Sequence, residues 1–204
     1  MNYPDYLPHH NQPAVLTEEQ YNDPIHAIYD FFDWYDLVHA RARLCLWIKT
    51  AFSNRRLRRT TLLEVLTLKE DLVPLLEAAT LLQDDNRWNI PDDEQDIIHP
   101  RWYFYKAYDR LNQWHYQPRH LTERQYRNPA RVFKQCTMRS TLPEWKTYLD
   151  SLFYAACYSN IGGYDGCVGH SEKEVNAHGQ AGRLVMLLEA AHLVYVRERL
   201  MKTE

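Results

Sequence analysis

The sequence has 204 residues, of which 45% are hydrophobic and 13% aromatic, a composition that excludes a largely disordered chain and suits one or two compact domains. A formal net charge of −3 argues against a globally basic nucleic-acid binder, and the sequence offers no apolar run long enough for a membrane-spanning helix. Four widely spaced cysteines without a C-x-x-C pair argue against a thiolate zinc site and suit the cytoplasm, where thiols stay reduced.

One ten-residue pattern occurs twice in the chain. Residues 12–21 (QPAVLTEEQY) return as residues 117–126 (QPRHLTERQY), 105 positions later. A second pair of similar runs, 72–81 and 184–193, has an offset of 112. We interpret the two pairs as a tandem duplication of a three-helix unit. The predicted organisation is an extended segment (1–11), helical repeat 1 (12–82), an acidic linker plus aromatic helix (83–116), and helical repeat 2 (117–204).

Each repeat opens on the same helix-start signals. Thr17 and Gln20 have the spacing of a capping box, in which the two side chains satisfy each other's backbone N–H groups. Asp23 then precedes Pro24, the order expected at the start of a further helix. The second repeat has both signals again (Thr122, Gln125, Asn128 and Pro129).

Two longer helices follow in each repeat. Asp36 is expected to cap the first of them in repeat 1, and Thr141 starts the matching helix of repeat 2. The next helix should span about 60–82 in repeat 1, where Pro74 is expected to kink or interrupt it, and about 171–199 in repeat 2. Since no stretch shows the alternation of a strand, the predicted fold is an all-α helical bundle.

Two glutamates occur within apolar helical runs, Glu77 and Glu189. A carboxylate at such a position needs a cationic or hydrogen-bonding partner if it is buried. Arg41 and Lys146 occupy equivalent positions in the two repeats. We therefore predict one structural ion pair within each repeat, Glu77 with Arg41 and Glu189 with Lys146. Exposure of the glutamates at the surface is the alternative.

The densest basic run is the predicted loop that holds four arginines (Arg55, Arg56, Arg58 and Arg59). Guanidinium groups gathered at a helix start can hold phosphates, so this loop is a candidate nucleic-acid site. The alternative is a solvated turn whose arginines answer nearby acidic residues.

A metal site on the helices is a remote alternative to the nucleic-acid site. Its five candidate ligands are His170, Glu174, His178, Glu189 and His192. Glu189 and His192 have the Glu-x-x-His spacing of carboxylate-bridged di-iron bundles, but repeat 1 has Thr80 in place of the histidine. His178 and His192 would also lie about 21 Å apart along one helix. We therefore predict neither a metal site nor a cofactor.

Arg110 and His115 have the R-x4-H spacing of the all-α HEPN ribonucleases. The resemblance covers six residues, and residue 111 is leucine where that family usually has a polar residue. It would imply an RNA-cleaving site in the aromatic linker helix.

No complete catalytic set emerges from the sequence. The function predicted from it is a non-enzymatic interaction or accessory protein that binds a protein partner through a groove or an exposed helical surface. The alternative is a nucleic-acid-binding protein that uses the arginine loop, and a ribonuclease or metal-binding bundle ranks below both.

Overall fold

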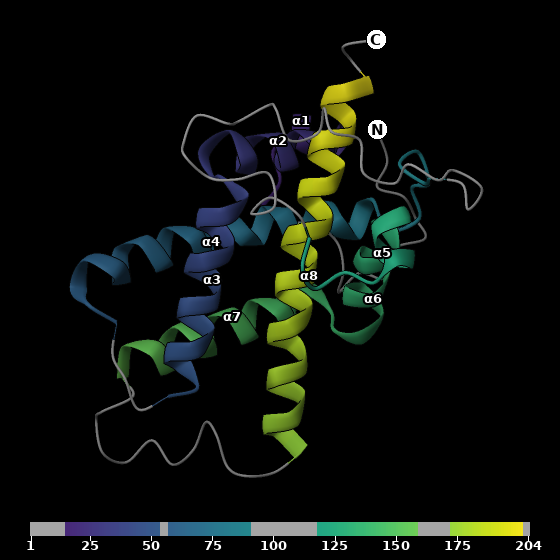
Figure 1. Cartoon of the computed structure of the whole chain (residues 1–204). Coiled ribbons are helices and arrows are strands. Elements are labelled where there is room, and N and C mark those ends of the chain that lie inside the picture. Colours follow the sequence, from purple (N-terminus) through teal and green to yellow (C-terminus); the bar gives the residue numbers. More distant parts are fainter. Residues whose placement is uncertain (1–14, 54–56, 91–117, 159–171, 202–204) are drawn as a thin grey trace.

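A computed structural model describes residues 15–53, 57–90, 118–158 and 172–201. This part of the chain is helical throughout and contains no strand (Figure 1). Its helices are α1 (Glu18–Asn22), α2 (Ile25–Trp34), α3 (Leu37–Ala51), α4 (Arg59–Leu81), α5 (Glu123–Arg127), α6 (Ala130–Arg139), α7 (Leu142–Tyr158) and α8 (Glu172–Met201). The all-α prediction is confirmed, and none of the described helices combines the length and apolarity needed to cross a membrane.

The short helices α1 and α5 begin at the predicted capping boxes. The Thr17 hydroxyl accepts from the Gln20 N–H, and the Gln20 side chain accepts from the Thr17 N–H. Thr122 and Gln125 form the same reciprocal pair at the start of α5. The repeated sequence pattern is therefore a local device that satisfies the backbone donors of a helix start.

The following helices begin close to the predicted positions. α2 starts at Ile25, one residue after Pro24, and the Asp23 side chain accepts from the Ile25 N–H. Asp36 caps α3 by accepting from the backbone of the next turn. α4 continues from Arg59 to Leu81 with Pro74 inside it, so the helix is not interrupted at that proline.

One core joins the helices of both halves of the sequence. α8 runs through the structure and packs against α2, α3, α4, α5 and α6, while α7 packs against α3 and α4 (Figure 1). The largest fully buried side chains include Trp47 on α3 and Trp145 on α7. The two halves therefore share their apolar interior, whose burial is the main stabilising contribution to the fold.

The acidic stretch after α4 also contributes to this core. Trp88 is buried, and its indole N–H donates to Glu198 Oε1 on α8 at 2.7 Å. The Ile90 N–H donates to the Arg127 carbonyl at the end of α5. The first part of the predicted linker is thus fixed to the helices it was expected to connect.

Candidate functional site

The most strongly constrained charged groups are the two glutamates in apolar runs. Glu77 on α4 and Glu189 on α8 are both fully buried. Removing a carboxylate from water has a penalty of several kcal/mol unless charged and hydrogen-bonding partners replace its hydration. The donors around each carboxylate therefore determine what these positions do.

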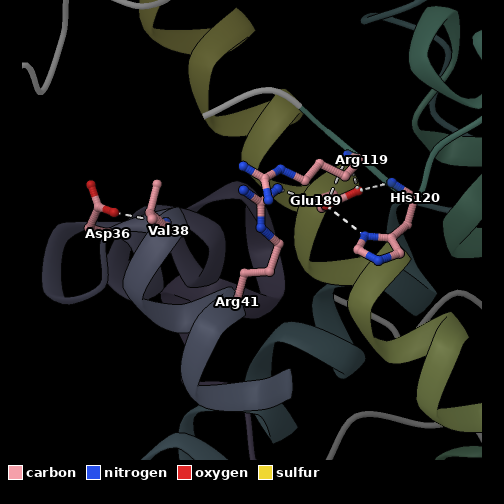
Figure 2. A network of polar contacts seen from close by, with 6 residues as sticks. All are labelled: Asp36, Val38, Arg41, Arg119, His120 and Glu189. Atoms are coloured by element: carbon pink, nitrogen blue, oxygen red, sulfur yellow. Dashed lines mark hydrogen bonds and ion pairs between the residues drawn. The ribbon is translucent and has the colours of Figure 1, made fainter. Parts of the chain in front are cut away.

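Glu189 accepts hydrogen bonds from two directions (Figure 2). Arg41 Nη1 on α3 donates to its Oε1 at 2.8 Å. The backbone N–H groups of Arg119 and His120, in the segment before α5, donate to its Oε2 at 3.0 and 2.9 Å. His120 Nδ1 also lies 3.0 Å from Oε1. Both carboxylate oxygens are thus engaged.

Glu77 has a closely similar set of partners. The backbone N–H groups of Val15 and Leu16, in the segment before α1, donate to its Oε2 at 2.8 and 3.1 Å. Lys146 Nζ on α7 lies 2.8 Å from its Oε1. Each buried carboxylate therefore ties a cation on a neighbouring helix to the chain segment that leads into a capping box.

The predicted pairing within each repeat is wrong, because the partners are exchanged. Arg41 of the first half pairs with Glu189 of the second, and Lys146 of the second half pairs with Glu77 of the first. α3 packs against α8, and α7 packs against α4, so each cation meets the carboxylate of the other half. The ion pairs therefore link the halves rather than brace each one.

The two sites differ in their exposure to solvent and in one side chain. The Arg41 side chain is 7% exposed, whereas that of Lys146 is 34% exposed. His120, which adds a side-chain contact at Glu189, occupies the position equivalent to Val15. The Glu189 site is thus the more enclosed and the more polar of the two.

Electrostatics favour the charged form of Glu189. Burial alone would raise the pKa of this carboxyl group, but the hydrogen bonds from His120, Arg119 and Arg41 together outweigh burial and lower its pKa. A carboxylate with a lowered pKa and both oxygens engaged is a poor general base. Its chemistry is that of a carboxylate that is charged at neutral pH and positions the chain around it.

The predicted arginine loop lies mostly outside the described residues. Arg55 and Arg56 fall in the undescribed segment 54–56. Arg58 is exposed at the N-cap of α4, and Arg59 is the first residue of that helix. Of the four arginines, Arg58 and Arg59 therefore lie at the start of α4.

The candidate metal ligands are not brought together in the described structure. His170 lies outside the described residues, and Glu174 and His178 are on α8 with side chains that are not described. Glu189 faces Arg41 and His120, whereas the His192 ring stacks against Tyr195. Among the described side chains, no group of three potential ligands could hold a metal ion.

The ribonuclease-like pair cannot be placed. Arg110 and His115 both lie in the undescribed segment 91–117, together with the predicted aromatic helix.

Sequence reasoning missed a polar cluster that closes one end of the bundle. The Arg197 guanidinium on α8 donates to the carbonyls of Trp88, Arg127 and Tyr126. The neighbouring Glu198 accepts from the Trp88 indole. Arg197 thus joins the segment after α4 to the end of α5, and a lone tryptophan in the acidic stretch was the signal that could have located this contact.

Large apolar side chains are exposed at the ends of two equivalent helices. Trp34, the last residue of α2, is 88% exposed, and Met138, near the end of α6, is 76% exposed. Both helices bury their opposite faces in the core. These two side chains are the candidate contact residues of the molecule.

Comparisons of the chain with protein-family models, with curated proteins and with solved structures found no match.

Proposed function

We propose that this chain is a non-enzymatic interaction protein that binds a protein partner through exposed faces of its helices. The observation that carries the proposal is the almost complete exposure of the Trp34 indole on a helix whose inner face is buried. Tryptophan is among the residues most enriched at the energetic centres of protein interfaces.

The helix beneath Trp34 is firmly held, which favours a preorganised contact. Ile28 and Phe32 on α2 are each 1% exposed, and Phe32 makes an edge-to-face contact with His192 on α8. A side chain presented by a packed helix loses little further backbone freedom when a partner binds. Met138 on α6 is presented in the same way, above the buried Phe133 and Cys136.

We also infer that the chain is a tandem duplication of a three-helix unit. The two capping boxes, the two buried glutamates and the exchanged cations support this reading, because each feature of one half has a counterpart in the other. Such a chain can replace a homodimer by one polypeptide. We place the protein in the cytoplasm, an assignment supported by the free thiols of Cys45, Cys136 and Cys157.

Nucleic-acid binding is the second candidate function. Arg58, one of the four arginines of the predicted loop, is exposed at the start of α4, and this favours a phosphate contact there. Replacing the four loop arginines with glutamine should abolish a salt-dependent shift of labelled RNA or DNA if this function holds.

The experiment that tests the main proposal is affinity capture with the full chain as bait, scored for protein and nucleic acid together. Trp34→Ala should reduce recovery of the specific protein partner at least tenfold, since an interface hot spot contributes about 2 kcal/mol or more. Leu63→Ala, a matched change at an exposed apolar residue of α4, should leave recovery unchanged. Equal recovery by both variants would contradict the proposal.

A further inference from the structure

The equivalent helical pairs α1–α2 and α5–α6 carry opposite charge. Residues 18–34 contain five carboxylates and neither lysine nor arginine, a formal charge of −5 (Glu18, Glu19, Asp23, Asp30 and Asp33). Residues 123–139, which are offset by 105 positions, contain five basic residues against Glu123, a formal charge of +4 (Arg124, Arg127, Arg131, Lys134 and Arg139). The near-neutral net charge of the chain conceals this difference.

All of these charged residues except Arg127 are exposed. Asp30 and Asp33 on α2 are exposed, as are Arg131, Lys134 and Arg139 on α6. We call residues 18–34 the acidic face and residues 123–139 the basic face. Each face also presents one large apolar side chain, Trp34 on the acidic face and Met138 on the basic face. A charged surface around an exposed apolar anchor is the usual composition of a protein contact.

Local ion pairs neutralise little of either face. Asp33 is 3.2 Å from Arg199, and Lys134 is 2.8 Å from Asp84, but all four side chains are more than 40% exposed. Exposed pairs of this kind contribute roughly 0–1 kcal/mol and are easily replaced. Within the described part of the chain, no ion pair joins the acidic face to the basic face.

The two faces contact α8 through different residues. Tyr29 of α2 makes a ring contact with Tyr195, whereas the Cys136 thiol of α6 donates to the Arg183 carbonyl. Residues 183 and 195 are about 18 Å apart along a helix axis. α2 lies beside the C-terminal half of α8, and α6 lies on its other side (Figure 1). The complementary charges therefore remain available to a second molecule.

We propose that the acidic face of one molecule binds the basic face of a second copy of the same chain. The charge complementarity of the two faces supports this partner, and the proposal rests on the proposed function as an interaction protein. The contact is heterologous, because it joins two different surfaces. Each bound pair leaves one acidic and one basic face open, so association continues into a ring or an open chain.

The test is sedimentation velocity of the full chain at about 50 mM and about 500 mM salt, where the Debye length falls from roughly 14 Å to roughly 4 Å. The unmodified protein should show a concentration-dependent increase in mass at low salt that is lost at high salt. Glu18→Lys with Asp30→Lys reduces the formal charge of the acidic face from −5 to −1, and Arg131→Glu with Arg139→Glu reduces that of the basic face from +4 to 0. Each double variant alone should associate at least tenfold more weakly.

Mixing the two double variants provides the decisive control. The two variants should associate with each other at low salt into a 1:1 complex, because the intact acidic face of one variant meets the intact basic face of the other. Circular dichroism of each variant establishes that it is folded. If each double variant fails to associate alone and the mixture does not associate either, the inference is overturned. An unmodified protein that stays monomeric at every concentration and salt would overturn it too.

The remaining outcomes separate this inference from the proposed function. A monomer that still captures a partner in a Trp34-dependent manner would overturn self-association and leave the proposed function standing. A monomer whose basic face shifts a labelled oligonucleotide, with the shift lost in Arg131→Glu with Arg139→Glu, would assign that face to nucleic acid and overturn the second copy as its occupant.

Discussion

Arg41 on α3 donates to Glu189 on α8 at 2.8 Å, although the two residues are 148 positions apart in the sequence. The pair is enclosed, with the Arg41 side chain 7% exposed and that of Glu189 fully buried. Together with the Lys146–Glu77 pair, it fixes how the two halves of the chain pack against each other. Several measurements can test this role.

Removing the arginine should destabilise the fold strongly. Arg41→Met leaves the buried Glu189 carboxylate without its cation, and breaking such a pair costs about 3–5 kcal/mol. The expected result in urea is a lower midpoint with an unchanged slope. Lys146→Met should cost less, because the Lys146 side chain is 34% exposed. Arg43→Met, which changes a partly exposed pair with Glu64, is the matched control and should cost roughly 1 kcal/mol or less.

A double-mutant cycle should show that the coupling runs between the halves. Combining Arg41→Met with Glu189→Gln should give an interaction energy of about 1–3 kcal/mol, because the two side chains are in direct contact. Combining Arg41→Met with Glu77→Gln should give nearly additive effects. A larger interaction energy for Arg41 with Glu77 than for Arg41 with Glu189 would instead support the pairing within each half that the sequence suggested.

The exchange of ion-pair partners is a feature that the sequence could not predict, whereas the helix starts could be predicted. Thr17 with Gln20, and Asp36, could be identified as helix starts because capping depends on residues a few positions apart. Arg41 and Lys146 could be matched because the similar runs 12–21 and 117–126 have the same offset of 105 positions. Which carboxylate each cation meets depends on the packing of α3 and α7 across the core, and no local pattern encodes that arrangement.

Burial was equally hard to predict where local composition is polar. Trp88 lies among acidic and polar residues, and the surrounding sequence therefore indicates a linker. Its burial follows from contacts with Glu198 and Arg197, both more than 100 positions away.

Acid should weaken the stabilising contribution of Glu189. Its pKa is lowered in the folded protein, and an unfolded glutamate titrates near about 4.3. The ionised carboxylate therefore stabilises the fold fully above the unfolded pKa, and that contribution is lost as the pH falls through the folded pKa. The difference in unfolding free energy between the unmodified protein and Glu189→Gln should shrink from pH 6 towards about pH 3. Glu64→Gln, which changes a half-exposed carboxylate of a surface pair, is the control for general effects of acid on the fold.

The two capping boxes should contribute separately to stability. Thr17→Ala and Thr122→Ala each remove the hydroxyl that accepts from the third residue of a helix, a loss of about 1 kcal/mol. Because the boxes lie in different halves, the double variant should lose close to the sum of the two. Replacement by serine restores a hydroxyl and should recover most of the loss. A variant without any change in its thermal midpoint would show that the box shapes the chain without stabilising it.

Removing the Trp88 indole N–H should show how much its hydrogen bond to Glu198 contributes to the stability of the fold. Trp88→Phe keeps a buried aromatic ring but leaves Glu198 Oε1 without the donor at 2.7 Å. Leaving a buried acceptor without its partner costs about 1–3 kcal/mol, and the smaller ring adds a cavity term. Trp34→Phe makes the same substitution at an exposed indole, and surface changes of this kind usually alter stability by less than about 0.5 kcal/mol. Urea unfolding should therefore give a clearly lower unfolding free energy for Trp88→Phe than for Trp34→Phe. If Trp88→Phe were as stable as Trp34→Phe, the acidic stretch would be a passive connection, and the link between Trp88 and α8 would not hold the two halves together.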